Sequence, residues 1–254
     1  MTKEEMKGFI AVILNMGIIQ LGDLNDYWST EDTNNLPFFR SVFSRDRFFQ
    51  IFGALHVGDI ESTTKRGKIQ PFLDRICPAF EAAFTPSQQI AIDESVITYK
   101  GRVSFRQYLK GKPNPWGIKA FVLADSQTGY LNRVRIYYGK ETQLLDSTLP
   151  HTVKVVMTLV EPFHHQGYDL YLDRFYGSPL LSTELSKVGI TVTGTVQANR
   201  RGLPKEVTAK QKEPRGTVRA ARSGNMVALS WLDKRKVLML STKHSTAVVQ
   251  VRTR

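Results

Sequence analysis

The sequence is almost devoid of cysteine, since Cys77 is the only one in 254 residues. A single thiol excludes a disulfide within the chain and a zinc site built from cysteine, and it is typical of a reducing, intracellular compartment. Long apolar runs are also missing, because the longest, from residue 9 to residue 19, is interrupted by Asn15 and Gly17. That run is far shorter than the roughly 20 residues that span a bilayer. We therefore expect no membrane partner.

Acidic residues are scarce at one end of the sequence. The whole chain has 35 Lys and Arg against 23 Asp and Glu, a net charge of +12, yet residues 1–93 hold 9 basic and 12 acidic groups. Residues 199–254 hold 14 basic and 3 acidic groups, a net charge of +11. This asymmetry favours a polyanionic partner such as nucleic acid. A solvated basic hairpin without a ligand explains the charge equally well, so charge alone does not decide.

The first 88 residues have the spacing of helices. Thr2 and Glu5 form a capping box in front of apolar residues at helical spacing. Ser44 is expected to cap a second helix, and a third is expected over residues 69–84. Pro78 should kink that third helix or begin a new one.

The pattern changes at Gln89, where short apolar runs and turns replace the helical spacing. Strands are expected at residues 90–93, 119–124, 130–137, 168–173, 190–196, 226–232 and 237–241, with helices at 153–163 and 178–187. The core order is therefore strand, hairpin pair, helix, strand, helix, strand. This order predicts a mixed α/β fold with an antiparallel portion.

Two aspartates, Asp93 and Asp173, each close an apolar strand. Neighbouring strand ends in one sheet could place these carboxylates close together, and paired carboxylates suit Mg²⁺. Two such ions about 3.5–4 Å apart can activate a water and stabilise the leaving oxygen of a phosphodiester. An acid at a strand end is more often a turn or cap residue, so the spacing alone leaves both interpretations open.

Basic and aromatic side chains alternate after Asp93, from residue 101 to residue 119. Lys and Arg can neutralise phosphates, and Tyr and Trp can stack on bases. The aromatics Phe105, Tyr108 and Trp116 could instead pack this loop over the sheet, and both functions can coexist. The cations that we predict to contact DNA are Lys100, Arg102, Arg106, Lys112, Lys119, Arg200, Arg201 and Lys205.

A series of linked motifs runs through the chain. They are Asp26-Tyr27-Trp28-Ser29, Ser44-Arg45-Asp46-Arg47-Phe48, Ile92-Asp93-Glu94, Lys100-Gly101-Arg102, Lys112-Pro113, Gly117-Ile118-Lys119, Asp125-Ser126, Leu172-Asp173-Arg174-Phe175-Tyr176-Gly177-Ser178-Pro179 and Gly194-Thr195-Val196-Gln197-Ala198-Asn199-Arg200-Arg201-Gly202-Leu203-Pro204. Together, and in this order, they resemble the piggyBac transposases. The resemblance covers essentially the whole chain.

The resemblance implies an RNase H-like core with three catalytic aspartates, which cuts DNA at transposon ends and joins the freed 3′-OH to TTAA sites with Mg²⁺. Asp93 and Asp173 match the first and second aspartates, and so the metal ligands. Residues 1–88 match a helical dimerisation and DNA-binding region, which implies a homodimer. Residues 89–198 match the first part of the core, and residues 199–254 match a basic, β-rich insertion.

The sequence also departs from the family pattern. The third aspartate of the family lies beyond the insertion in a Gly-Gly-Val-Asp type motif, which does not occur before Arg254. Asp233 is expected in a tight turn between two strands, so we do not take it as the third ligand. Arg174 stands where the family usually has Asn, and a cation there would compete with Mg²⁺ for Asp173. We therefore expect an incomplete core and an incomplete Mg²⁺ site.

Three functions remain open, and whether this chain is an enzyme is undecided from its sequence. We favour a domesticated, transposase-derived protein that binds double-stranded DNA in the nucleus and does not cut it, with no small-molecule cofactor. An active transposase or endonuclease core is the alternative if further chain follows Arg254. A protein-interaction scaffold is the second alternative, and the basic end of the chain argues against it.

Overall fold

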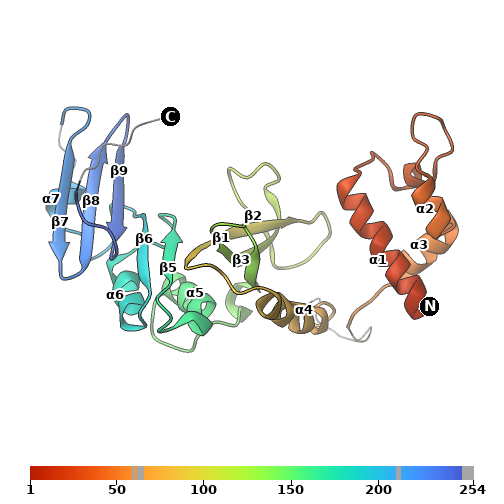
Figure 1. The fold of residues 1–254 in the computed structure, drawn as a ribbon, viewed down its shortest axis with the longest axis horizontal. Coiled ribbons are helices and arrows are strands. Elements are labelled where there is room, and N and C mark those ends of the chain that lie inside the picture. The colour runs from red at the N-terminus through yellow and green to blue at the C-terminus, as the bar shows by residue number, and fades with distance from the viewer. Residues whose placement is uncertain (59–60, 62–65, 210–212, 248–254) are drawn as a thin grey trace. The chain divides into compact units, whose positions relative to one another are not determined.

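The computed structural model describes residues 1–58, 61, 66–209 and 213–247. The chain divides into two compact units, Met1–Leu73 and Asp74–Arg254 (Figure 1). Two parts of the predicted insertion, 210–212 and 248–254, lie outside the described residues. Among the residues described, none of the helices is long and apolar enough to cross a bilayer.

The first unit is helical, as predicted. Its elements are α1 (Lys3–Ile18), the short 3₁₀ helix η1 (Leu24–Trp28), α2 (Pro37–Val42) and α3 (Arg45–Ala54). The Thr2 hydroxyl accepts the Glu5 N–H at 3.1 Å, and the Glu5 carboxylate accepts the Thr2 N–H at 2.9 Å. Ser44 caps α3 by accepting the Arg47 N–H at 3.3 Å. Both predicted caps are therefore confirmed, and they start helices whose apolar sides meet in an aromatic core of Phe9, Tyr27, Trp28, Phe39, Phe43 and Phe48.

The helix α4 (Gln70–Ala83) runs through Pro78 as one element. The alternative that Pro78 begins a new helix was wrong, since α4 continues through it to Ala83. A proline removes one N–H···O bond and crowds one carbonyl, while the turns on either side keep their own hydrogen bonds. No residue of α4 is fully buried, so tertiary packing does not oppose a small local adjustment.

Nine strands in the described part of the second unit form one mixed sheet. They are β1 (Gln89–Thr98), β2 (Arg106–Tyr108), β3 (Trp116–Asp125), β4 (Leu131–Ile136), β5 (Asp169–Leu172), β6 (Thr191–Thr195), β7 (Val218–Ser223), β8 (Met226–Leu232) and β9 (Lys236–Ser241). Their order is β2-β3-β1-β5-β6-β9-β8-β7, and β4 also pairs with β3. The helices of this unit beyond α4 include α5 (His151–Val160), α6 (Pro179–Lys187) and α7 (Lys205–Thr208). Sequence patterns missed β2, β7 and α7, which are short or rich in polar residues.

The strands from β1 to β6 have the RNase H-like arrangement that the sequence predicted. β4, β3 and β1 are antiparallel neighbours, while β5 and β6 lie parallel to β1 on its other side. α5 lies between β4 and β5 in the chain, and α6 connects β5 to β6. Apolar residues of both helices and of these strands form the main core, so one face of the sheet is covered (Figure 1).

The last three strands extend the same sheet. β6 pairs antiparallel with β9, with Thr193 opposite Ser241, and the two hydroxyls lie 2.8 Å apart. A small second core of Val196, Val207, Leu238 and Leu240 packs beside this junction. Main-chain hydrogen bonds therefore join the basic end of the chain to the edge of the core.

Candidate active and nucleic-acid-binding site

Asp93 and Asp173 lie at neighbouring positions of the core sheet. β1 and β5 run parallel with Ile92 opposite Leu172, and each aspartate is the next residue along the chain. Adjacent strands lie about 4.8 Å apart, and residues in register point to the same face. Ile92 and Leu172 are buried in the main core. Because successive residues of a strand point to opposite faces, Asp93 and Asp173 point to the other face of the sheet, where both are exposed. The structure thus places the two predicted catalytic residues at neighbouring positions. The prediction that Asp93 closes its strand was wrong, because β1 continues to Thr98 through its pairing with β3, whereas Asp173 directly follows β5 as predicted.

A cluster of ionisable groups lies next to these aspartates. Glu94 Oε1 and Lys119 Nζ form an ion pair of 3.2 Å, with the two side chains only 13% and 16% exposed. Burial raises the pKa of the Glu94 carboxyl, the adjacent Asp93 raises it further, and Lys119 partly offsets both effects. The buried Tyr176 hydroxyl faces Glu94 but makes no hydrogen bond of full geometry. Its pKa is raised by burial and then by three carboxylates, those of Glu94, Asp93 and Asp173. Because both aspartates act on one hydroxyl, they belong to one electrostatic cluster.

Close backbone contacts fix the loop that follows Asp173. The Asp173 carboxylate accepts the Phe175 N–H at 2.8 Å, and the Asp173 carbonyl accepts the Gly177 N–H at 3.1 Å. A Cβ on Gly177 would lie 2.3 Å from the Thr195 carbonyl oxygen, so glycine is what lets the loop pack against the end of β6. Arg200 donates to the Phe175 carbonyl. Arg200, predicted as a DNA contact, is therefore also a structural support of this loop.

β2 and the start of β3 present two aromatic rings to solvent beside the half-buried Arg106, which also donates to the Lys100 and Gly101 carbonyls. The rings of Tyr108 and Trp116 are 5.1 Å apart, and these residues are 56% and 50% exposed. The Arg106 guanidinium lies 4.8 Å from the centre of the Trp116 ring. Phe105, by contrast, is buried against Tyr138. Packing against the fold therefore accounts for Phe105, while Tyr108 and Trp116 are available to a partner.

The other predicted DNA-contacting cations differ in how far they are engaged within the protein. Lys112 and Lys119 lie beside the aspartates, because Lys112 Nζ donates to the Glu94 carbonyl at 3.4 Å and Lys119 pairs with the Glu94 side chain. The Lys119 charge is thus largely neutralised within the protein, which weakens its case as a phosphate contact. The exposed members of the set are Lys100, Arg102, Lys112, Arg201 and Lys205.

Asp233 and Arg174 are the two residues that bear on the departures from the family pattern. Asp233 lies in the turn between β8 and β9 and pairs with Arg215 at 2.6 Å, as expected of a turn residue. Arg174 forms no ion pair with an acidic side chain of the described chain. It instead lines a cavity on the β6 and β9 side of the loop. Arg174 is therefore not the counter-ion of Asp173 in this structure.

The residues present fit part of a Mg²⁺ site. Asp93 and Asp173 offer exposed carboxylate oxygens, and Mg²⁺ commonly uses one or two carboxylates with waters and substrate phosphates. Glu94 is engaged by Lys119. Within the described ranges, no three His, Cys, Asp or Glu side chains are grouped so as to hold a metal ion. This part of the chain thus offers two carboxylates, which is fewer than the three aspartates that the resemblance implies.

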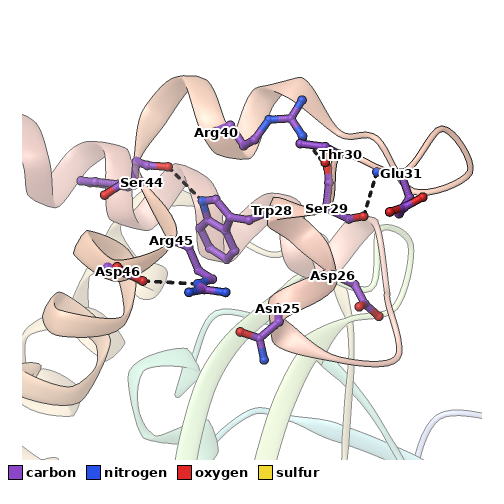
Figure 2. A pocket seen from close by; sticks show the side chains of 11 residues that line it. Asn25, Asp26, Trp28, Ser29, Thr30, Glu31, Arg40, Ser44, Arg45 and Asp46 are labelled. Atoms are coloured by element: carbon purple, nitrogen blue, oxygen red, sulfur yellow. Dashed lines mark hydrogen bonds and ion pairs between the residues drawn. The ribbon is translucent and has the colours of Figure 1, made fainter.

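A separate cavity of about 640 Å³ lies in the helical unit (Figure 2). Trp28 is at its centre and donates its indole N–H to the Phe43 carbonyl at 2.9 Å. Arg40 is used within the fold, since it donates to the Ser29 carbonyl at 2.5 Å. The lining includes cations and acids in similar number, among them Arg40, Arg45, Asp26, Glu31 and Asp46. The charges compensate one another, so this cavity does not select a ligand of one sign.

The strand order and the helices packed on the sheet define an RNase H-like fold. The family model described as Transposase IS4 matches residues 1–254, so the chain belongs to this transposase family. Comparisons with curated proteins and solved structures agree that it is of the piggyBac type.

The matched relatives are longer than this chain. It is 28% identical to PiggyBac transposable element-derived protein 3 of Homo sapiens over 254 residues, 95% of this chain and 42% of that protein. It is 26% identical to PiggyBac transposable element-derived protein 5 of Homo sapiens, over 96% of this chain and 49% of that protein. The solved piggyBac transposase synaptic complex with hairpin DNA matches with a TM-score of 0.88 and 24% identity, over 98% of this chain and 54% of that chain. The chain thus spans about half the length, or less, of these relatives.

Proposed function

We propose that the chain is a piggyBac transposase-derived protein that binds double-stranded DNA on the face of the sheet that bears Asp93 and Asp173, and that this chain alone does not cut it. The observation that supports the site most strongly is the parallel register of β1 with β5. It sets each aspartate one residue beyond a paired, buried Ile92 or Leu172, with Asp173 directly after β5 and Asp93 within β1. Asp173 thus lies at the carboxyl end of a parallel strand, where ligands of open α/β sheets bind.

The charge of the surrounding surface supports DNA as the ligand. Lys112 reaches the main chain beside Asp93, and Arg106 stacks on an exposed Trp116. Cations of this kind neutralise backbone phosphates without reading sequence. The solved structural neighbour is a transposase in complex with hairpin DNA, which agrees with this ligand class. A nuclear location and a homodimer belong to the same proposal, because the chain's relatives are transposase-derived proteins.

The aspartates would hold Mg²⁺ in this proposal. The bound ion would supply charge neutralisation at a scissile phosphate. The chain's own carboxylates orient toward one exposed face, and Tyr176 and Lys119 lie beside them. Asp233 is engaged by Arg215, which supports the view that the third carboxylate is not provided by it.

DNA binding is tested by fluorescence anisotropy of a labelled duplex titrated with the protein at several salt concentrations. We expect log Kobs to fall linearly with log[salt], with a slope steeper than about −3, because each neutralised phosphate releases close to one counterion. An affinity that does not change with salt, or no binding at low salt, would contradict the proposal and favour the protein-interaction scaffold.

Cleavage is tested by nicking of supercoiled plasmid in the presence of Mg²⁺. We expect nicking no faster than with the Asp93→Ala variant. The matched control is Asp46→Ala, which removes an exposed carboxylate in the helical unit. Robust nicking that is lost in Asp93→Ala and kept in Asp46→Ala would replace the non-cutting part of the proposal with the active endonuclease.

A further inference from the structure

We propose that the cavity beside Arg174 is a binding site for a backbone phosphate of DNA, with Arg174 and Lys236 as its cationic groups. This inference rests on the proposed function, because it assigns a phosphate-binding pocket within the proposed DNA-binding surface. Neither residue belongs to the set of cations that the sequence suggests as DNA contacts. The family resemblance gives Arg174 a different effect, competition with Mg²⁺ for Asp173.

The cavity has a volume of about 440 Å³ and is formed where three segments meet. Arg174 comes from the loop after β5, Thr195 and Gln197 come from the end of β6, and Lys236 comes from the start of β9. Its apolar wall is formed by Val237 and other aliphatic residues. A hollow of this size accepts a phosphate together with part of the attached sugar, whose carbon atoms suit an apolar wall.

The charge of the lining selects an anion. Arg174 and Lys236 are the charged residues that line the cavity, and none of the described acidic residues lines it. Arg174 makes no hydrogen bond or ion pair within the described chain, so its guanidinium keeps all five N–H donors. Lys236 Nζ donates one hydrogen bond to the Ala209 carbonyl at 2.7 Å, which holds the ammonium in place and leaves two donors.

The chemistry of Arg174 favours phosphate in particular. A guanidinium fork matches two oxygens of one phosphate and forms paired, charge-assisted hydrogen bonds. An acidic peptide would offer planar carboxylates to the same cations. DNA fits the wider surface better than an acidic peptide does, because that surface also holds the exposed Lys112, Arg106 and the stacking Trp116.

The position of the cavity links it to the aspartates. β5 and β6 are parallel with Leu172 opposite Gly194, so Asp173 and Thr195 are at the same level of the sheet. Arg174 directly follows Asp173 in the loop after β5. Gly177 of the same loop packs against the main chain of Thr195. A phosphate held by Arg174 would therefore lie near the proposed Mg²⁺ ligands. It would fix the position of the DNA backbone relative to them.

The test is duplex DNA binding by Arg174→Gln, measured by fluorescence anisotropy across a salt series. Loss of a charge-assisted contact is expected to weaken binding about tenfold at low salt and to reduce the salt slope by about 1. Arg174→Lys keeps the charge but not the fork, so it should retain the slope and lose part of the affinity. The matched control is Arg222→Gln, the same change at an exposed position of β7 whose side chain donates to the Gly224 carbonyl.

Lys236→Gln provides a second, independent variant. Because both cations contact one phosphate in this proposal, the double variant should lose less affinity than the product of the two single losses. Near-UV circular dichroism on each variant verifies that the fold is kept.

The outcomes separate this inference from the proposed function. If the wild-type protein does not bind DNA, the proposed function fails and this inference fails with it. If the wild type binds with a steep salt slope and Arg174→Gln behaves like Arg222→Gln, the DNA-binding function stands and the phosphate site is wrong. The phosphate site is also wrong if a poly-glutamate peptide, rather than DNA, is the ligand whose binding depends on Arg174.

Discussion

At the scale of single residues, environment rather than residue type separates the aspartates that are engaged within the fold from those that are available to a ligand. Asp125 belongs to a motif of the resemblance, yet it is buried in the fold. Its carboxylate accepts hydrogen bonds from Ser87 N and Oγ at 2.9 and 2.5 Å and from Thr128 N and Oγ1 at 2.7 and 2.6 Å. These donors hold its pKa well below the usual range. Asp93, by contrast, stays exposed and available to a ligand.

Replacing Asp125 by Asn should lower the melting temperature by on the order of 5 °C. Ser87 donates to one carboxylate oxygen and Thr128 donates to the other. Whichever way the Asn amide is turned, its NH₂ group therefore faces the donors of one of these two residues. Differential scanning calorimetry measures the shift. Asp46→Asn, at an exposed carboxylate, should change the melting temperature little, and an equal shift in both variants would contradict the account.

Asp169 predicts how stability depends on pH. Burial raises the pKa of its carboxyl, but the hydrogen bonds from Lys243 and Thr191 outweigh burial, so the folded pKa is lowered. A carboxyl whose pKa is depressed on folding contributes stability above its unfolded pKa of about 3.9 and loses that contribution as the pH falls. The melting temperature of the wild type should therefore fall as the pH drops below about 5. Asp169→Asn should be less stable at neutral pH and less sensitive to acid, and an unchanged acid slope would refute this role.

At the scale of elements, close packing of backbone segments positions the loop that bears Asp173. A Cβ on Gly194 would lie 2.2 Å from the Leu172 carbonyl oxygen, because β6 runs directly beside β5. Alternation of side chains explains why Ile92 is buried and Asp93 is exposed. The same rule could have found Glu94, which follows Asp93 and points back toward the core side, where Lys119 meets it.

Gly194→Ala should destabilise the protein by about 1–3 kcal/mol, because the added methyl group forces two backbones apart. Urea unfolding gives the free energy of unfolding. Gly53→Ala is the control, since an added methyl there meets nothing within 4 Å and lies on a helix, where alanine is favoured. If both variants are equally stable, the packing explanation for the Asp173 loop is wrong.

Sequence patterns located these elements unevenly. Helices with caps, such as α1 from Thr2, and strands with apolar alternation could be predicted, because the signals are local. β7 could not be predicted, since its sequence Val-Arg-Ala-Ala-Arg-Ser shows no apolar alternation and it forms a strand by pairing with β8. The cavity beside Arg174 was also beyond sequence reasoning, because its lining joins residues about 60 positions apart through the β6 and β9 pairing.

At the scale of the whole molecule, charge and topology point to the same region. The excess positive charge of residues 199–254 is joined to the RNase H-like core through β9. Asp93 and Asp173 therefore belong to the same sheet as β9, which supports the proposed binding of a polyanion there. The helical unit has its own aromatic core and a cavity of balanced charge.

The central claim is that Asp93 and Asp173 together bind one divalent ion. Iron-directed cleavage tests it: Fe²⁺ replaces Mg²⁺, ascorbate and peroxide generate hydroxyl radicals at the bound ion, and mass spectrometry locates the breaks in the protein backbone. We predict breaks near both residue 93 and residue 173, and their joint loss in Asp93→Asn but not in Asp46→Asn. Breaks elsewhere in the chain, or breaks near the two aspartates that persist in Asp93→Asn, would contradict the claim.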